Sequence, residues 1–562
     1  MMTFRLEKWL WALWLLLGMH FFMHNPGGAG LYLPFNAIGW VFASVLMGLG
    51  LWVCTQKGVV RLSRLWLRLG VMASLLWLPM LWGDAHLRDY ALPRLLGLMG
   101  GVLFLFALYQ SLTRDDGRHW LLNLLLGAVA IELTLGLVQF FLLTPGNWIG
   151  YDTAVNRPYG IFQQPNVMAS FMATGLAVAL WQEASASFSR SASWLRAYLL
   201  FGTPLLLVVL QSRVGQLGGG AVVLMMLPML SQNRAWRRPL LLVALGIVVG
   251  FAALYLVEGV RRGMEIYQSG GMRSIYWPYA WQLILQKPWL GWGYGGFESL
   301  FLHSYMAEKA LNPSMVQIEY NLDHPHNELL YWGVEGGLLP ILLLLAMAGM
   351  LLWRLRGQRW PRALALLALV TPMALHTQTE YPFYHSIVHW FLFLTLIWFI
   401  DEECEEMTRP GIRTLVYPHR LLLRFLALAI PLLVVPFMAT ALHTAWVVTK
   451  YERGGFKEPD LLLKVVNPVA WLTRVEFDVN GVRLAVGLQT KNRQELEAYI
   501  AWARDFVRHT PRVNIYAGMI EATLALGEGD AARTILSQAR LLYPDDPQLG
   551  ALSRRLSVES HP

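Results

Sequence analysis

Residues 239–257 read PLLLVALGIVVGFAALYLV, an apolar run without a charged side chain that directly follows Arg237 and Arg238. A helix needs about 20 such residues to cross a bilayer core of about 30 Å. Similar runs recur along the chain, in which 56% of the 562 residues are hydrophobic and only 14% are charged. The sequence therefore predicts an all-α protein that crosses a membrane many times.

The apolar runs predict about 13 transmembrane helices. Residues 1–449 then form a transmembrane domain that carries the catalytic site. An odd number of spans places the tail, 450–562, on the side of the membrane opposite the N-terminus. The predicted spans are 9–24, 35–55, 65–82, 92–112, 120–143, 165–182, 195–210, 214–230, 239–257, 327–353, 363–378, 385–400 and 421–449.

The lysines and arginines of the short loops indicate the orientation. With the N-terminus inside, the inside segments hold 21 lysines and arginines, and the short outside segments hold only Arg88, Arg94, Arg157 and Arg213. Such residues accumulate on the cytoplasmic side. We predict a multi-pass protein of the bacterial inner membrane with a cytoplasmic N-terminus and a periplasmic active site and C-terminus. Its basic residues lie in separate loops, which argues against a nucleic-acid partner.

Two outside regions are too long to be turns, 258–326 and the tail. Residues 273–284 are aromatic and amphipathic, which is typical of a helix at the membrane interface. The tail has an ordinary soluble composition and predicted helices at 494–509, 514–526, 530–542 and 547–556. Its spacing of alanine and leucine resembles one tetratricopeptide-type (TPR-like) hairpin, and a helical appendage packed on the membrane domain explains the pattern equally well.

Polar residues gather at the outside ends of the predicted spans. The densest group is DHPHNE at 323–328, with Glu335 about two turns deeper. Helix capping explains an aspartate and a proline at a helix start, but not two histidines. A histidine can act as a general base near neutral pH. We therefore predict a functional role for His326, and for His324 both a functional and a structural role stay open.

The outside arginines form a second group. Guanidinium groups at the headgroup level pair bidentately with phosphates, or simply contact ordinary lipids. We assign Arg94 to ordinary lipid contact. Arg213 differs because it interrupts a hairpin between two spans on the side that disfavours positive charge. The arginines predicted to bind phosphate are Arg88, Arg157, Arg213 and Arg273.

A third polar group is HTQTEYPFYH at 376–385. An aromatic belt at the membrane interface explains its tyrosines but not Glu380. The glycine-rich segment 288–297 does not follow a strand, so we interpret it as a tight turn and not as a nucleotide loop. The sequence contains no HExxH, CxxC, Walker lysine loop or G-x-S-x-G elbow, and Cys54 and Cys404 imply no disulfide. We expect no metal and no other cofactor.

The order of these motifs resembles a known superfamily. The motifs are Arg157…Gly160-x-Phe162-x-x-Pro165-Asn166, Ser212-Arg213-x-Gly215, Arg273-x-x-x-Trp277 with the 288–297 turn, and His326-Asn327 with Glu335-x-Gly337. Over most of residues 80–400 the sequence resembles O-antigen ligases, O-antigen polymerases and bacterial O-oligosaccharyltransferases. Glu380-Tyr381-Pro382 and the long tail resemble the pilin-glycosylating branch of the oligosaccharyltransferases.

The resemblance implies a GT-C-like membrane fold and a metal-independent, inverting transfer in one step. A glycan preassembled on undecaprenyl diphosphate moves to a Ser or Thr hydroxyl of a periplasmic protein such as a pilin. His326 matches the essential histidine, and Arg157 and Arg213 match the arginines that hold the diphosphate. Beside these we predict Glu335 as a catalytic residue, and as substrate-binding residues Arg88, Arg273, His324, Asn166, Gln164, Asn327, Glu380, Tyr381 and Tyr384.

The chemistry of such a transfer agrees with these residue types. Fixed arginines stabilise the leaving diphosphate, and His326 either deprotonates the attacking hydroxyl or binds the diphosphate as an imidazolium. Within the superfamily, the alternatives are an O-antigen ligase acting on lipid A-core and a polymerase acting on another lipid-linked repeat. A lipid-linked glycan transporter is the alternative of a different class, but we find neither inverted repeats nor a polar path through the membrane.

Overall fold

The computed structural model describes residues 2–111, 115–185, 192–257, 271–318, 321–405 and 411–558, so parts of the predicted outside loop 258–326 lie outside the described residues. The chain divides into two compact units. Unit 1 comprises residues 1–75, 96–270 and 343–449, and unit 2 comprises residues 76–95, 271–342 and 450–562. The tail therefore shares a unit with two earlier segments. The predicted division into a membrane domain and a periplasmic domain stays a prediction.

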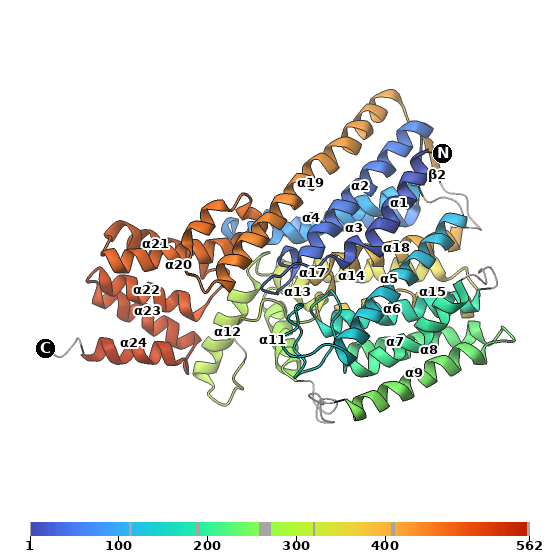
Figure 1. Ribbon diagram of the computed structural model, residues 1–562. Helices are drawn as coiled ribbons and strands as arrows, with labels where there is room; N and C mark the ends of the chain where they lie inside the picture. The colour runs from blue at the N-terminus through green and yellow to red at the C-terminus, as the bar shows by residue number, and fades with distance from the viewer. Residues whose placement is uncertain are drawn as a thin grey trace. The chain divides into compact units, whose positions relative to one another are not determined.

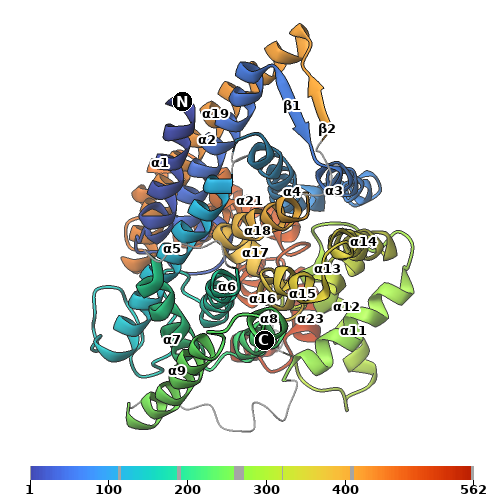
Figure 2. The ribbon, with the colours of Figure 1, turned by 90° about the vertical axis from the view of Figure 1, so that its right-hand side faces the viewer.

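Unit 1 consists almost entirely of helices (Figure 1). Two short strands, β1 (Val59–Leu62) and β2 (Gly411–Thr414), pair antiparallel with Val59 opposite Thr414 (Figure 2). The helices that lie wholly or largely in unit 1 are α1 (Met2–Leu16), α2 (Pro34–Lys57), α3 (Arg64–Leu75), α4 (Ala85–Ser111), α5 (Asp115–Phe141), α6 (Pro165–Ala184), α7 (Ser193–Val209), α8 (Arg213–Leu230), α9 (Arg237–Leu256), α14 (Leu338–Leu355), α15 (Trp360–Ala368), α16 (Thr371–Thr377), α17 (Pro382–His385), α18 (Ile387–Glu405) and α19 (Tyr417–Arg453).

Unit 2 combines helices of the central segment with the helices of the tail. They are α11 (Arg273–Gln286), α12 (Phe297–Leu311), α13 (Glu328–Gly336), α20 (Leu472–Thr490), α21 (Arg493–Phe506), α22 (Val513–Ala525), α23 (Gly529–Leu542) and α24 (Pro547–Val558). Aromatic and aliphatic side chains of both groups form one apolar core, in which Tyr279 and Phe301 of the central segment and Tyr499 and Leu536 of the tail are buried. The four tail helices predicted from the sequence are confirmed as α21–α24.

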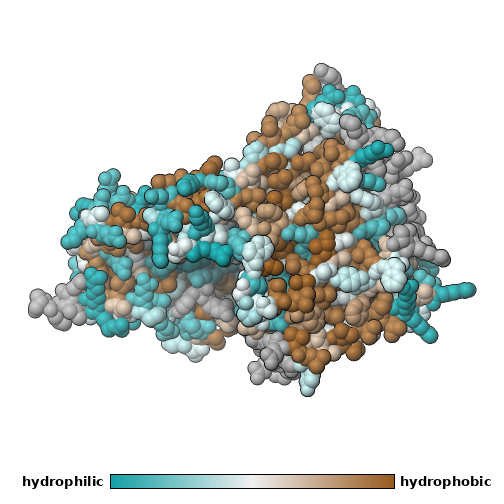
Figure 3. All heavy atoms as spheres, in the orientation of Figure 1, coloured by the Kyte–Doolittle hydropathy of each residue, from teal (hydrophilic) through white to brown (hydrophobic). Residues whose placement is uncertain are grey.

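The structure confirms a polytopic all-α membrane protein. Among the described residues, nine helices are long and apolar enough to cross a membrane, and α7 is a shorter apolar helix. Large apolar side chains are exposed along α9 at Leu241, Val248 and Phe251, and such a surface needs lipid around it. Figure 3 shows a broad hydrophobic surface over the helices of unit 1 and a mostly hydrophilic surface over the tail helices.

Several predicted spans are shorter or more polar than their apolar runs indicate. The predicted span 363–378 is divided into α15 and α16, because Pro372 has no backbone N–H to continue a helix and starts a new one. The predicted span 385–400 corresponds to α18, which continues into Asp401, Glu402 and Glu403. The predicted spans 9–24 and 195–210 correspond to the shorter helices α1 and α7, so four of the thirteen predicted spans are not among the nine found in the described residues.

The centre of unit 1 is α6, whose side chains from Val167 to Gln182 are all buried. It packs closely on α8, because a Cβ at Gly215 would lie 2.3 Å from the Cβ of Ala169. On another face, a Cβ at Gly175 would lie 2.4 Å from Val129 of α5. Small residues at such contacts let membrane helices approach closely. This packing fixes the first turns of α6 and α8 beside each other.

Candidate active site

The predicted site residues are divided between the two units, and each group is described by itself. The group in unit 1 is Arg157, Gln164, Asn166, Arg213, Glu380, Tyr381 and Tyr384. The group in unit 2 is Arg88, Arg273, His324, His326, Asn327 and Glu335. The unit 1 group thus contains the arginines expected to hold a diphosphate, and the unit 2 group contains the predicted base.

In unit 1, two buried side chains of α5 hold the loop that carries the first motif. Gln139 accepts hydrogen bonds from the backbone amides of Tyr159 and Gly160 at 2.9 and 2.8 Å. Glu132 accepts the amide of Ile161 at 2.9 Å. Gly160 has a φ of 58°, and a Cβ there would lie 2.2 Å from a Glu132 oxygen. Only glycine fits this left-handed position, which explains the glycine of the motif.

The first turns of α6 and α8 are joined by side-chain hydrogen bonds. Ser212 caps α8 by accepting the amide of Gly215 at 3.3 Å, and its hydroxyl donates to Asn166 Oδ1 at 2.8 Å. Gln164 caps α6 by accepting the amide of Asn166 at 2.6 Å. The Asn166 side-chain amide donates to Glu380 Oε1 at 3.4 Å. Residues of three separate sequence motifs therefore form one connected network.

Arg157 is bonded to the turn between α7 and α8, and Arg213 follows directly after this turn. The guanidinium of Arg157 donates from Nε and Nη2 to the carbonyl oxygen of Leu210 at 3.2 and 3.1 Å. Leu210 is the C-cap of α7, and Arg213, three residues later, is the first residue of α8. Gln211 between them has a φ of 49°. Both arginines are half-buried, at a helix start where anionic groups are stabilised.

The third motif rests on a chain of buried histidines. His376 Nδ1 lies 2.8 Å from Ser170 Oγ, and Ser170 Oγ lies 3.2 Å from His389 Nε2. His385 Nε2 donates to the carbonyl oxygen of Phe162 at 2.8 Å, so α17 is tied to the loop of the first motif. These contacts hold the segment that carries Glu380. Its neighbours Tyr381 and Tyr384 are half-buried.

In unit 2, the His-Pro-His segment is held from both sides. The indole of Trp277 on α11 donates to the carbonyl oxygen of Pro325 at 3.0 Å. The backbone amide of His326 donates to Nδ1 of the buried His324 at 2.9 Å, and Nε2 of His324 lies 3.5 Å from Glu328. Nδ1 of His324 is thus an acceptor and carries no proton. His324 holds the backbone of His326, an arrangement that the sequence pattern did not specify.

His326 itself has a φ of 55° and is half-buried. A left-handed conformation is unusual for a residue with a side chain and is found often at functional sites. The next residue, Asn327, is the N-cap of α13, and its Oδ1 accepts the amide of Leu330 at 3.0 Å. Asn327 therefore fixes the start of the helix directly after His326. Its predicted contact with substrate stays a prediction.

Glu335 lies at the other end of α13, where its carboxylate connects this helix to α4 and to the turn before α12. Its Oε2 pairs with Arg94 at 2.6 Å, and its Oε1 accepts the backbone amides of Gly295 and Phe297 at 2.9 and 3.3 Å. The side chains of Arg94 and Glu335 are only 6% and 1% exposed. Our assignment of Arg94 to ordinary lipid contact was wrong, because a carboxylate distant in sequence is buried against it.

The glycine-rich segment 288–297 forms the tight turns expected from the sequence. The amides of Trp292 and Gly293 donate to the carbonyl oxygens of Val334 and Glu335 at 3.0 and 2.8 Å. At Gly291, a Cβ would lie 2.4 Å from the Glu335 carbonyl oxygen, and the φ is 65°. The turns therefore support the C-terminal end of α13, and their glycines are required by close backbone approach.

The two remaining arginines of unit 2 lie apart from the histidine segment in sequence. Arg88 donates to the carbonyl oxygen of Gly83 at 3.1 and 2.8 Å and to that of Leu81 at 3.4 Å, so it closes the loop before α4. Arg273 is the first residue of α11, the helix that also carries Trp277. The predicted contacts of both arginines with phosphate stay predictions.

No group of three metal-binding side chains occurs among the residues that the structure describes. Independence from metal ions remains an expectation from the resemblance. Cys54 and Cys404 are buried free thiols. Sequence reasoning missed Ser212, Arg94 and Glu328 as supporting residues. For Ser212 the sequence did contain a signal, because a serine directly before a predicted helix is a typical N-cap.

Three family models match successive parts of the chain. Residues 158–181 match the model described as "Protein glycosylation ligase", residues 197–345 match "O-Antigen ligase", and residues 364–555 match "Virulence factor membrane-bound polymerase, C-terminal". No curated protein is similar enough to the chain to match it. The three matches cover, in order, the Asn166 motif, the segment from Arg213 to His326, and Glu380 with most of the tail. Together the three matches support a place for this chain in the superfamily of membrane O-antigen ligases and oligosaccharyltransferases.

Proposed function

We propose that this protein transfers a preassembled glycan from undecaprenyl diphosphate to Ser or Thr hydroxyls of periplasmic proteins, in one inverting step at the outer face of the inner membrane. The observation that carries the proposal is the network of Glu380, Asn166 and Ser212 in unit 1. It connects the Glu-Tyr-Pro motif, which resembles the protein-glycosylating branch, to the start of the helix that carries Arg213.

The arginine group of unit 1 supports the departure of the diphosphate. Arg157 is bonded to the carbonyl oxygen of Leu210, and Leu210 lies three residues before Arg213 in the sequence. The capped N-terminus of α8 adds a partial positive charge at Arg213. The leaving diphosphate gains negative charge in the transition state, so fixed positive groups stabilise the transition state more than the bound donor.

The histidine group of unit 2 supports activation of the acceptor. Three contacts hold the segment around His326: the indole of Trp277, the imidazole of His324 and the cap at Asn327. A base that is held in place by its backbone loses little entropy when a hydroxyl approaches. In the proposed reaction, the imidazole of His326 takes the proton of the attacking hydroxyl as the new glycosidic bond forms and the bond to the diphosphate oxygen breaks.

The other members of the superfamily differ from this proposal mainly in the acceptor. The match to an O-antigen ligase model over residues 197–345 fits a lipid A-core acceptor, and the match to a polymerase model over residues 364–555 fits a lipid-linked repeat. We place the protein acceptor first because Glu380 is hydrogen-bonded to Asn166, which accepts from Ser212 at the start of the helix that carries Arg213. An experiment therefore has to identify the acceptor molecule.

The test is co-expression with a defined undecaprenyl-linked glycan pathway in bacteria that lack their own ligase. Wild type, His326→Ala and the control His86→Ala, a change at an exposed histidine in unit 2, are compared at equal expression. Glycan is then detected on periplasmic proteins, on lipid A-core and on the lipid-linked pool. We expect glycan on protein with the wild type and with His86→Ala, and a loss of at least about a hundredfold with His326→Ala.

The other outcomes reject the protein acceptor. Glycan on lipid A-core alone identifies an O-antigen ligase, and longer lipid-linked chains with neither acceptor modified identify a polymerase. Full activity of His326→Ala removes the histidine from the reaction, whatever the acceptor is.

A further inference from the structure

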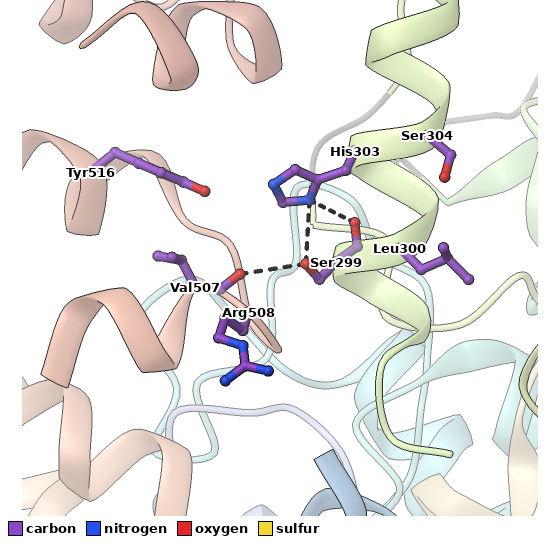
Figure 4. Close-up of a pocket in the computed structure, with 7 residues that line it drawn as sticks. All are labelled: Ser299, Leu300, His303, Ser304, Val507, Arg508 and Tyr516. Atoms are coloured by element: carbon purple, nitrogen blue, oxygen red, sulfur yellow. Dashed lines mark hydrogen bonds between the residues drawn. The ribbon is translucent and has the colours of Figure 1, made fainter. Parts of the chain in front are cut away.

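A cavity of about 330 Å³ opens in unit 2 between α12 and the segment that joins α21 to α22 (Figure 4). Ser299, His303 and Ser304 line it from α12 together with Leu300. Val507, Arg508 and Tyr516 line it from the tail. A volume of this size is within the range of small-molecule sites, about 300–1,000 Å³. None of these residues belongs to the motifs that define the superfamily.

The polar groups of the cavity are held in fixed directions. Nδ1 of His303 donates to the carbonyl oxygen of Ser299 at 2.8 Å, which leaves Nε2 as an acceptor when the ring is neutral. Figure 4 shows this second nitrogen and the hydroxyl of Tyr516 pointing into the space between the two walls. Burial raises the pKa of Tyr516 to about 12, so its hydroxyl keeps its proton and can donate. His303 and Tyr516 thus present one acceptor and one donor to the cavity.

The walls of the cavity are tied together and carry no excess charge. The hydroxyl of Ser299 donates to the carbonyl oxygen of Val507 at 3.4 Å. Arg508 pairs with Asp84 at 2.6 Å and with Asp505 at 3.6 Å, so its charge is compensated within unit 2. A ligand with a full charge has no matching counter-charge here. The lining favours a neutral ligand with several hydroxyl groups.

The cavity does not offer the usual features of peptide recognition. Such sites use a free strand edge, an apolar groove for a helix, an aromatic-lined groove for a proline-rich segment or an arginine cluster for acidic groups. Here one wall is the helix α12 and only Leu300 and Val507 are aliphatic. An open hollow lined by an imidazole, hydroxyls and one phenol instead suits a sugar ring.

We propose that this cavity binds a sugar unit of the glycan being transferred, at a distance from the bond that breaks. The inference rests on the proposed function. It is supported by the connection within unit 2: Ser299 is two residues from Phe297, whose amide binds Glu335. Glu335 lies eight residues after Asn327 along α13, about 12 Å at 1.5 Å per residue. Glu335 and α13 thus connect the segment of Ser299 with the segment of His326 within unit 2.

The test compares two donors with the same first sugar: undecaprenyl diphosphate carrying a monosaccharide and carrying the complete oligosaccharide. The purified full-length protein is assayed as wild type, His303→Ala, Tyr516→Phe and the control Arg533→Ala, a change at an exposed residue of α23. We expect kcat/KM for the oligosaccharide donor to fall about five- to tenfold in the two cavity variants, as for the loss of one hydrogen bond. The monosaccharide donor and the control should be unaffected.

Equal losses with both donors would overturn the proposal, because the cavity would then act on the acceptor or on folding, and thermal unfolding separates these two causes. Unchanged kinetics with both donors would also overturn it. If the wild type transfers neither glycan, the proposed function fails, and a binding measurement still tests the cavity. In that experiment, free glycan released from the host's lipid-linked pool must bind the wild type, and His303→Ala must weaken this binding, as measured by saturation-transfer NMR.

Discussion

Glu335 is a polar residue whose surroundings became clear only from the structure, in which it is buried and paired with Arg94. From the sequence it is a carboxylate near two histidines, and we predicted a catalytic role. In the structure, one oxygen pairs with Arg94 and the other accepts two backbone amides. Three aromatic rings surround the Arg94 guanidinium at 4.2–4.7 Å: Trp332, Tyr331 and Tyr294. Glu335 therefore holds the distal end of α13 in place, and its catalytic role stays a prediction.

This placement makes Glu335→Gln a destabilising change. Removal of one partner leaves the Arg94 charge buried and uncompensated, which costs about 3–5 kcal/mol. We expect a lower unfolding temperature in detergent and a lower yield, with His326→Ala unchanged in both. The double variant Arg94→Leu/Glu335→Leu should recover part of the lost stability. A stable but inactive Glu335→Gln would instead show that the carboxylate takes part in the reaction.

The start of α8 shows how a short motif builds a helix end. In Ser212-Arg213-x-Gly215, the serine caps the helix, the arginine opens it and the glycine allows contact with Ala169. The sequence therefore contains the reason for the position of Arg213. It does not contain the partner of the serine, because Asn166 lies on another helix, 46 residues away.

We expect Ser212→Ala to lower the transfer rate while the fold persists. Loss of the cap costs about 1 kcal/mol of local stability. If the same free energy is lost from the stabilisation of the transition state by Arg213, kcat falls about fivefold. Ser212→Thr keeps the hydroxyl and serves as the matched variant, and Ser231→Ala at the end of α8 serves as the control. A fully active Ser212→Ala would show that the network of Asn166 and Glu380 does not position the arginine.

Helices were predictable where the hydrophobic pattern is compatible with a helix but not with a strand. Long apolar runs such as 239–257 gave membrane helices, and the four amphipathic tail helices were placed within a few residues. The helix α20 was not predicted. From Val475 to Asn480 apolar and polar residues alternate, with Val475, Phe477 and Val479 as the apolar series, a pattern that favours a strand. Its helical state depends on packing in unit 2, which the local pattern does not contain.

The sequence predicts a set of candidate site residues, but it predicts few of the contacts that the structure shows between them. The motifs identified the arginines, the histidine segment and Glu380. The supporting bonds join residues far apart in sequence: Arg94 to Glu335, Ser212 to Asn166, and Trp277 to the loop before His326. Contacts of this kind arise when helices pack together, so the local pattern of one sequence does not predict them.

On the scale of the complete chain, unit 2 contains a buried carboxyl that makes its stability depend on pH. Burial and the nearby Glu452 raise the pKa of Asp478 from 3.8 to about 7, and Arg474 opposes the shift. The folded state therefore holds a proton that the unfolded state has released between these values. Stability from this group is complete below pH 3.8 and is lost as the pH rises through about 7.

We accordingly expect Asp478→Asn to remove this part of the pH dependence. Near pH 4 the variant and the wild type should unfold at similar temperatures. At pH 8 the variant should be the more stable protein, by about 2–4 °C for each kcal/mol. Unfolding temperatures in detergent at pH 4, 6 and 8 measure the difference, with Asp530→Asn at an exposed site as the control. A difference between variant and wild type that stays constant with pH would contradict the assignment.

The most direct test of the proposed function is reconstitution in liposomes with one donor and two competing acceptors. Purified protein receives undecaprenyl-diphosphate glycan, a periplasmic pilin and lipid A-core, and intact-mass spectrometry follows both acceptors. We expect the pilin to gain the mass of the complete glycan in a single step, at a Ser or Thr, and we expect His326→Ala to abolish this gain. Transfer to lipid A-core with an unmodified pilin would contradict the proposed function.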